Sequence, residues 1–196
     1  LVLASGNSGK LKEFNQLLSP LGLDVRPQAE FGVHDVEETG LTFVENALLK
    51  AREASRVSGL PALADDSGLE VDALHGAPGI YSARYAGEPK SDERNNEKLL
   101  AALSECAEGQ RTARYWCVLV YLRHAEDPVP VIVQRSWEGE VLAHPRGEGG
   151  FGYDPLFWLP DQGMSVAELP SETKNRLSHR GRALHTLVDI LKVAHG

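Results

Sequence analysis

The sequence is poor in cysteine and in basic residues, and it contains no long apolar run. Its two cysteines, Cys106 and Cys117, form neither a CxxC pair nor a zinc-binding spacing, so we expect buried, reduced thiols. Its 20 basic residues are outnumbered by 28 acidic ones, which gives a net charge of −8. This balance argues against broad electrostatic binding to a nucleic acid polymer or to an anionic membrane. It leaves room for a small anionic ligand held by a few cations and a metal.

The absence of a long apolar run also bears on location. No segment approaches the roughly 18 apolar residues needed to span a bilayer, and no signal peptide is visible. We therefore expect no membrane anchor and a cytoplasmic protein. The chain begins at Leu1 inside an apolar run, so we expect a few native residues to precede it. Its 196 residues are ample for one domain with a substantial core and too few for two large ones.

The order of the predicted elements indicates an α/β fold. An apolar strand over 1–4 enters a glycine turn, and a helix over 10–19 follows. A capping box at Thr42 and Glu45 starts a second helix, which Gly59 ends. The remaining predicted elements are strands near 23–26, 62–64 and 156–159, a helix over 92–107, a hairpin formed by 112–123 and 129–137, and a terminal helix around 183–191. We therefore predict a single α/β domain over residues 1–196, with a mixed sheet pinched into two lobes around a cleft.

The first candidate site is the turn between the first strand and the first helix. It consists of Ser5, Gly6, Asn7, Ser8, Gly9 and Lys10. Backbone amides at a helix start bind anions, glycines allow close approach, and Lys10 adds a positive charge. The segment is not a Walker A loop, because Leu11 follows the lysine. Two interpretations stay open: a phosphate-binding loop, or a tight turn with a solvated lysine.

The second candidate is an acidic set made of Glu37, Glu38, Asp65 and Asp66. Glu38 precedes a predicted helix and Asp66 lies at a predicted strand end, the places where α/β folds present groups to a ligand. Carboxylates suit Mg²⁺, which takes its other ligands from water and substrate phosphates. Adjacent carboxylates repel each other unless a cation is near, which favours a functional role for Asp65 and Asp66. The alternative for Glu37 and Glu38 is stabilisation of the helix dipole.

Two further candidates lie towards the C-terminus. The loop over 149–155, in which four residues are Gly or Pro, displays Phe151, Tyr153 and Asp154. This arrangement suits stacking on a base and acceptance of a ring N–H, and a hydrophobic plug is the alternative. The other candidate combines Lys174 with the segment 178–181, whose charges could point one way or simply face solvent.

These segments, in this order, resemble the inosine triphosphate pyrophosphatase family, and its bacterial branch in particular. The matching segments are LASGNSGK (3–10), EETGLTFVENALLKA (37–51), ADDSGLEV (64–71), GAPGIYSARYAG (76–87), GGFGYDPLF (149–157) and SHRGRAL (178–184). They spread over nearly the whole chain, and six motifs in register are highly specific. The one departure is Ser5, where Thr is common in the family.

The resemblance implies hydrolysis of ITP, dITP and XTP to the monophosphate and pyrophosphate, with Mg²⁺ as cofactor. It also implies an elongated two-lobed α/β fold with a central substrate cleft, and a homodimer. It makes Asp66 the general base, and Glu38 and Asp66 the metal-binding residues. The substrate-binding residues that it implies are Ser5, Gly6, Asn7, Ser8, Gly9, Lys10, Ser67, Phe151, Gly152, Tyr153, Asp154, Lys174, His179 and Arg180. For Lys50, in the helix behind Glu38, we expect a phosphate or carboxylate partner.

Two other functions use the same groups. The residues alone do not distinguish cleavage at the α-phosphorus from cleavage at the γ-phosphorus, so a Mg²⁺-dependent γ-phosphatase is one alternative. A nucleotide sensor without turnover is the other. The acidic set argues against the sensor, because extra carboxylates do not help to bind a polyanion unless a metal is engaged.

Overall fold

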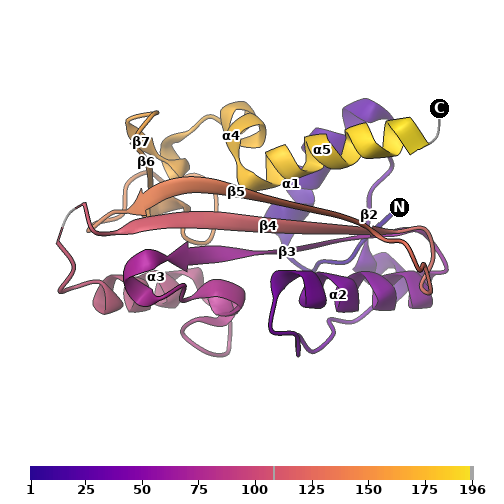
Figure 1. Cartoon of the computed structure of the whole chain (residues 1–196), viewed down its shortest axis with the longest axis horizontal. Helices are drawn as coiled ribbons and strands as arrows, with labels where there is room; N and C mark the ends of the chain where they lie inside the picture. The colour runs from indigo at the N-terminus through magenta and orange to yellow at the C-terminus, as the bar shows by residue number, and fades with distance from the viewer. Residues whose placement is uncertain (108, 195–196) are drawn as a thin grey trace. The chain divides into compact units, whose positions relative to one another are not determined.

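The computed structural model describes residues 1–107 and 109–194 (Figure 1). The helices are α1 (Ser8–Leu18), α2 (Phe43–Ser58), α3 (Asp92–Ala102), α4 (Ser171–Leu177) and α5 (His179–Ala194). The strands are β1 (Val2–Leu3), β2 (Arg26–Pro27), β3 (Ala62–Val71), β4 (Thr112–Leu122), β5 (Val131–Val141), β6 (Phe157–Leu159) and β7 (Met164–Ser165). Within the described residues, none of the helices has the length and apolar character needed to cross a bilayer.

The strands form one mixed sheet in the order β2-β1-β3-β4-β5-β6-β7. β1 pairs in parallel with β2 and β3, whereas β5, β6 and β7 pair antiparallel. β4 and β5 are neighbours joined by residues 123–130, which is too short for a parallel crossover and forms the predicted hairpin (Figure 1). The structure therefore confirms the α/β class and the mixed sheet.

The contacts within the chain group it into two compact units. The first unit comprises Leu1–Asp66, Cys117–Arg135 and the chain from Arg180 onward. The second unit comprises Ser67–Trp116 and Ser136–His179. The chain passes from one unit to the other within β3, within β4, within β5 and at the start of α5, between His179 and Arg180.

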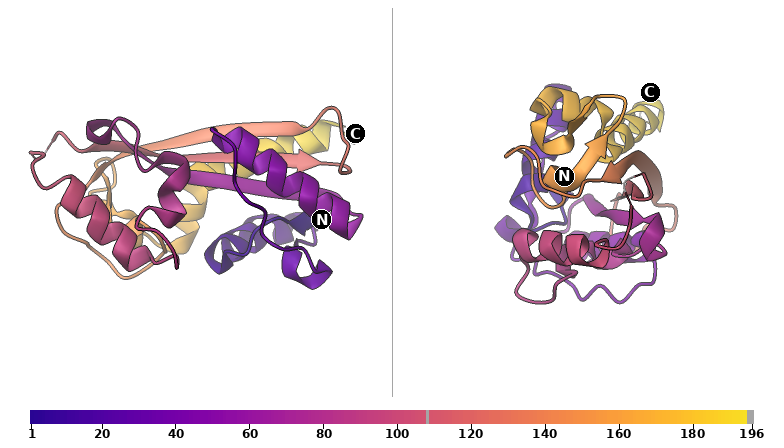
Figure 2. Two further views of the ribbon diagram at one scale, coloured as in Figure 1. Left: turned by 90° about the horizontal axis from the view of Figure 1, so that it is seen from below. Right: turned by 90° about the vertical axis from the view of Figure 1, so that its left-hand side faces the viewer.

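The first unit has helices on both faces of its strands, because strand side chains alternate between two cores. Leu3, Leu63 and Leu119 share a core with the apolar faces of α1 and α5. The alternate positions, such as Val2 and Val118, share a second core with the alanine-rich face of α2. Figure 1 shows α5 above and α2 below these strands, and the view from below places α2 in front of them (Figure 2).

Among the described residues, the core of the second unit includes Leu99 from α3 and Leu103, which directly follows that helix. The predicted helix over 92–107 is too long, since α3 ends at Ala102. The carbonyl groups that follow its end are bound by Arg111, whose guanidinium donates to the carbonyl oxygens of Leu103 and Cys106 at 3.0–3.2 Å. A buried arginine therefore replaces the last turn that the periodicity of the sequence predicted.

Candidate functional site

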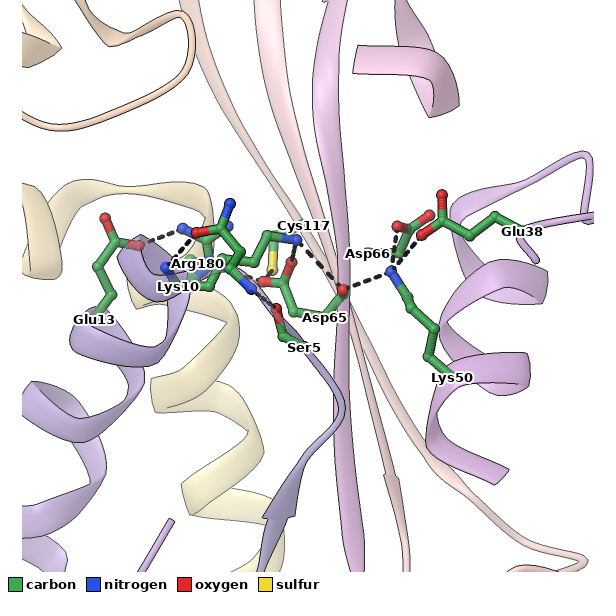
Figure 3. A network of polar contacts seen from close by, with 10 residues as sticks. Ser5, Lys10, Glu13, Glu38, Lys50, Asp65, Asp66, Cys117 and Arg180 are labelled. Atoms are coloured by element: carbon green, nitrogen blue, oxygen red, sulfur yellow. Dashed lines mark hydrogen bonds and ion pairs between the residues drawn. The ribbon is translucent and has the colours of Figure 1, made fainter. Parts of the chain in front are cut away.

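The two adjacent aspartates lie in the middle of β3, and the predicted strand end at Asp66 is wrong. β3 runs unbroken from Ala62 to Val71. Because strand side chains alternate, Asp65 lies on the face covered by α1 and α5, and Asp66 lies on the face covered by α2. Figure 3 shows the two carboxylates pointing to opposite sides of the strand. The two charges therefore avoid each other, and each has cationic partners of its own.

The Asp65 carboxylate belongs to a buried network of ion pairs. Arg180 Nε donates to Asp65 Oδ2 at 2.7 Å, and the ammonium of Lys10 contacts Asp65 Oδ1. The guanidinium of Arg180 also contacts the carboxylate of Glu13. The thiol of Cys117 donates to Asp65 Oδ2, with 3.3 Å between Sγ and the oxygen. The expectation of a buried thiol is confirmed for Cys117, whereas Cys106 is only half-buried.

The charges in this network stabilise one another strongly. Burial alone would raise the pKa of Asp65, but the charges of Arg180 and Lys10 outweigh it and hold the pKa well below its ordinary value. Burial alone would lower the pKa of Arg180, but Asp65 and Glu13 raise it well above its ordinary value. For Cys117, burial and the neighbouring Asp65 raise the thiol pKa, so the sulfur keeps its proton. The network is thus ionised at neutral pH around a neutral thiol.

On the other face of β3, one ammonium bridges the carboxylates of Glu38 and Asp66. Lys50 Nζ lies 3.0 Å from Glu38 Oε1, 2.6 Å from Asp66 Oδ1 and 3.0 Å from the carbonyl oxygen of Asp65 (Figure 3). The partner expected for Lys50 is therefore a pair of carboxylates. Burial lowers the pKa of Lys50, yet the charges of Asp66 and Glu38 outweigh this effect and raise it. Lys50 consequently remains charged.

The second oxygen of Asp66 has no hydrogen-bond partner among the described residues. This atom, Oδ2, is buried. Burial raises the pKa of Asp66 above its ordinary value, although the charges of Lys50 and Lys10 act in the opposite direction. A buried carboxylate oxygen with an unused acceptor and a raised pKa is suited to take a proton from a bound water.

The same geometry fits a hard divalent cation. Glu38 and Asp66 already converge on one positive charge, and Asp66 Oδ2 has a free lone pair. Mg²⁺ commonly uses one or two carboxylates and completes its shell with water and phosphate oxygens. Within residues 1–107 and 109–194, three or more His, Cys, Asp or Glu side chains do not gather at any potential metal site. The site therefore suits an ion that shares its coordination with a substrate, and not an all-protein cage.

Glu38 is positioned by the start of α2. Asn46 Oδ1 accepts a hydrogen bond from the backbone N–H of Gly40 at 2.8 Å. Gly40 packs so closely that a Cβ there would lie 2.6 Å from Glu45 Cβ, which only glycine avoids. Thr42 caps the helix as predicted, because its Oγ1 accepts from Glu45 N–H at 3.2 Å. These contacts fix the start of α2 and so place Glu38 next to Lys50 of the same helix. Glu37, by contrast, is exposed.

The predicted anion-binding turn caps α1. Asn7 Oδ1 accepts from the backbone N–H of Lys10 at 2.9 Å, and Ser5 Oγ accepts from Asn7 N–H at 3.1 Å. The first amides of a helix have no partner within the helix. The N–H groups of Ser8 and Gly9 are therefore the ones that can meet an anion, with Gly6 exposed beside them. The side chain of Lys10 lies against Asp65.

In the second unit, the glycine loop over 149–155 is built around the carboxylate of Asp154. Asp154 Oδ2 accepts from the backbone N–H of Phe151 at 3.0 Å and from Lys174 Nζ at 2.7 Å. Asp154 Oδ1 accepts from the hydroxyl of Tyr115 at 3.1 Å. Lys174 Nζ also lies 4.5 Å from the centre of the Phe151 ring, at cation–π distance. Asp154 thus holds this loop together.

Two other predicted binding residues of this unit are buried. Tyr153 lies in the hydrophobic core, and its hydroxyl donates to the carbonyl oxygen of Ser82 at 2.7 Å. The ring of His179 stacks on that of Tyr115, with 4.7 Å between the centroids and 11° between the planes. Ser67 follows Asp66 on β3 and is half-buried.

Two residues of the site were missed by the sequence analysis. Glu13 pairs with Arg180. Its only signal in the sequence was a charged residue on the same side of the predicted helix as Lys10 and Phe14. Tyr115 links Asp154 to His179, and its only signal was a position on the buried face of a predicted strand. Neither signal identifies a partner by itself.

Comparisons with known proteins give one consistent result. The sequence model of the Ham1 family matches residues 1–190. A protein of Shigella flexneri named dITP/XTP pyrophosphatase is 58% identical to this chain over 192 residues, which cover 98% of both sequences. A protein of Nitrosomonas europaea with the same name is 58% identical over 191 residues, which cover 97% of this chain and 93% of the relative. A HAM1 protein structure from Coxiella burnetii superposes with a TM-score of 0.89 at 49% identity over 97% of each chain. The Staphylococcus aureus Ham1 structure gives 0.86 at 42% identity over 98% of each chain.

Proposed function

This chain belongs to the Ham1 family, and we propose on that basis that it hydrolyses ITP, dITP and XTP to the monophosphate and pyrophosphate. Such a reaction removes non-standard purines from the nucleotide pool and so keeps them out of DNA and RNA. Relatives named dITP/XTP pyrophosphatase, which the chain matches over nearly its full length, support the proposal. The structural observation that carries it is Asp66: a buried carboxylate with a raised pKa, an oxygen lacking a partner and an ammonium at its other oxygen.

The first unit supplies groups for the triphosphate. A nucleoside triphosphate carries about four negative charges, and a protein with a net charge of −8 must neutralise them locally. The N–H groups of Ser8 and Gly9, the start of α1 and the ammonium of Lys10 form one anion-binding set. Lys50 offers a second cation beside Asp66. These groups hold the phosphates next to the general base.

The chemical step is an attack of water on the α-phosphorus. Asp66 Oδ2 accepts a proton from the water as its oxygen bonds to phosphorus, and the bond from the α-phosphorus to the bridging oxygen breaks. Pyrophosphate leaves with that electron pair, and the nucleoside monophosphate remains. A positioned general base of this kind contributes about 10²–10⁴-fold in rate. Lys50, which contacts Asp66 Oδ1, holds the carboxylate in place during the transfer.

The proposal includes Mg²⁺, held by Glu38 and Asp66. When bound, the ion supplies positive charge that stabilises the charge developing on the pyrophosphate. Chelation by EDTA should then abolish turnover, and added Mg²⁺ should restore it. A second readout does not depend on turnover: Mg²⁺ should raise the melting temperature of the wild type more than that of Glu38→Gln. Equal Mg²⁺-induced shifts in both proteins would remove Glu38 from the metal site.

We assign recognition of the purine to groups of the second unit. Phe151 offers a ring that stacks on any purine. Hypoxanthine and xanthine carry a 6-oxo acceptor where adenine carries a 6-amino donor, so hydrogen-bond donors around His179 and Lys174 favour the former. An unpaired buried polar group costs about 1–3 kcal/mol, so two mismatches give about 10²-fold discrimination against ATP or more.

One product analysis separates this function from its alternatives. Purified protein is incubated with ITP and Mg²⁺, and the nucleotides are resolved by liquid chromatography. IMP plus pyrophosphate is the expected result. IDP plus phosphate would identify a γ-phosphatase, and unchanged ITP would leave a sensor. ATP run in parallel should be hydrolysed at least about 100-fold less efficiently, as estimated above.

A homodimer and a cytoplasmic location complete the proposal. The first rests on the family resemblance, and the second on the place where the nucleotide pool is used. Light scattering after gel filtration should give twice the mass of 21.3 kDa calculated for one chain. A mass of one chain at micromolar concentration would contradict the dimer.

A further inference from the structure

Two side chains of α3 hold both polar groups of the residue that follows Phe151. Asp92 Oδ2 accepts a hydrogen bond from Gly152 N–H at 2.8 Å, and Asn96 Nδ2 donates to the carbonyl oxygen of Gly152 at 3.0 Å. We propose that Asp92 and Asn96 are positioning residues that fix the Phe151 ring for stacking on the purine. The proposal rests on the function proposed above and adds residues that touch neither substrate nor metal.

The two contacts act as one clamp because of helix geometry. Asp92 and Asn96 are four residues apart on α3, so their side chains project from the same face of the helix. Gly152 has a φ of +61°, a left-handed conformation that glycine adopts readily and that an unrestrained glycine leaves as readily. Binding both its N–H and its carbonyl group removes that freedom.

The clamp completes a set of anchors around Phe151. On the N-terminal side, the N–H of Phe151 itself is held by Asp154. On the C-terminal side, Tyr153 is buried and bonded to Ser82. Gly152 is the residue between these two anchors. The peptide group before it is also held by the Asp154 N–H, which donates to the carbonyl oxygen of Phe151 at 3.2 Å, and the α3 contacts add a partner for the Gly152 N–H and one for its carbonyl group. The clamp therefore determines the direction in which the Phe151 ring points.

The environment of Asn96 argues against a purely structural role. Its Oδ1 atom is buried, and no described residue hydrogen-bonds to it. A buried acceptor without a partner destabilises a fold. The buried Oδ1 atom therefore costs stability, and within the described part of the chain the Asn96 amide makes its hydrogen bond to Gly152.

Asp92 also has a matched control on the same turn. Asp92 and Glu93 are both acids in the first turn of α3, where either stabilises the helix dipole. Asp92 holds Gly152. Replacing each by alanine removes the same charge from the same helix end. A difference between the two variants therefore reports the contact with Gly152.

The test measures kinetics on ITP and inhibition by inorganic tripolyphosphate, a ligand that lacks a base. In the double variant Asp92→Ala/Asn96→Ala, KM for ITP should rise about tenfold, the scale of one or two lost hydrogen bonds. The kcat and the inhibition constant of tripolyphosphate should each change less than about twofold, a change that is small beside the tenfold rise in KM. Glu93→Ala should match the wild type. Asp92→Asn, whose amide oxygen can still accept from the Gly152 N–H, should have a KM for ITP much closer to that of the wild type than Asp92→Ala has.

Several outcomes would overturn the proposal. An unchanged KM in the double variant would do so, as would a parallel loss of tripolyphosphate binding, which indicates general damage. If the wild type does not hydrolyse ITP, the proposed function fails, and amide hydrogen exchange of Gly152 decides the clamp separately. Faster exchange in Asp92→Ala but not in Glu93→Ala supports the clamp, and equal exchange in both contradicts it.

Discussion

Replacing Asp65 and Asp66 one at a time by asparagine should separate stability from turnover. Asp65→Asn removes one of the two carboxylates that contact the buried guanidinium of Arg180, whose side chain is 3% exposed, and leaves the carboxylate of Glu13 in place. It also removes the carboxylate partner of Lys10. Removing one member of a buried ion pair costs about 3–5 kcal/mol, because it leaves an uncompensated charge. In a protein of this size each kcal/mol lowers the melting temperature by about 2–4 °C, so the expected fall is about 6–20 °C.

Asp66→Asn should behave in the opposite way. Burial disfavours the charge of Asp66, as its raised pKa shows, so loss of that charge recovers part of the desolvation cost. Lys50 retains Glu38 as a carboxylate partner. The melting temperature should therefore move much less than in Asp65→Asn. Turnover of ITP should fall about 10²–10⁴-fold, because the variant lacks the proposed general base.

The assay pairs calorimetric melting of the metal-free proteins with kcat measured well below the lower melting temperature. Asp65→Asn should be the less stable variant and should retain more turnover than Asp66→Asn. The reasoning is refuted if Asp65→Asn melts with the wild type, since its network would then contribute nothing. It is equally refuted if Asp66→Asn keeps more than about a tenth of wild-type kcat, because removal of a positioned general base lowers the rate by about 10²-fold or more.

Three further predictions concern single contacts. Lys50→Met should lower the metal-free melting temperature and enlarge the rise caused by Mg²⁺, because two carboxylates lose their shared cation; an unchanged Mg²⁺ shift in thermal melting would contradict this. Tyr115→Phe removes the hydroxyl that binds Asp154, so KM for ITP should rise about 3–10-fold with kcat nearly constant, and steady-state kinetics showing the reverse would exclude that role. Arg114 and Thr112 lower the pKa of Asp72 to about 2, so the stability that Asp72 adds is present above about pH 4 and is lost as the pH falls towards 2. Asp72→Asn should therefore melt less than about 4 °C below the wild type at pH 7, with the gap closing by pH 2–3; a gap that widens in acid would be inconsistent.

The sequence predicted the elements well where local chemistry decides them. The caps at Thr42 and Gly59 and the alternation of apolar residues define α2 and the strands around it. It failed at Asp65 and Asp66, where two acids, a serine and a glycine are poor strand formers and suggested that the strand ends. Tertiary partners on both faces of β3 neutralise those acids and keep the strand continuous, and no local pattern contains that information.

Site membership was easier to predict than the pairing within the site. The motifs pointed to Lys10, Asp65 and Arg180, yet the ion pair between Asp65 and Arg180 joins residues 115 positions apart. Glu13 and Arg180 are 167 positions apart. Such contacts depend on how α1 and α5 pack on the same face of the sheet. Spacing along the chain carries no trace of them, so only the structure shows that Arg180 is bound by two carboxylates.

The central claim is that water attacks the α-phosphorus of ITP with Asp66 as base, and isotope labelling tests it most directly. The reaction is run with Mg²⁺ in water enriched in ¹⁸O, and the products are examined by mass spectrometry. We expect one ¹⁸O atom in the phosphate of IMP and none in pyrophosphate. Label in pyrophosphate or in inorganic phosphate would show attack at a different phosphorus and would contradict the account.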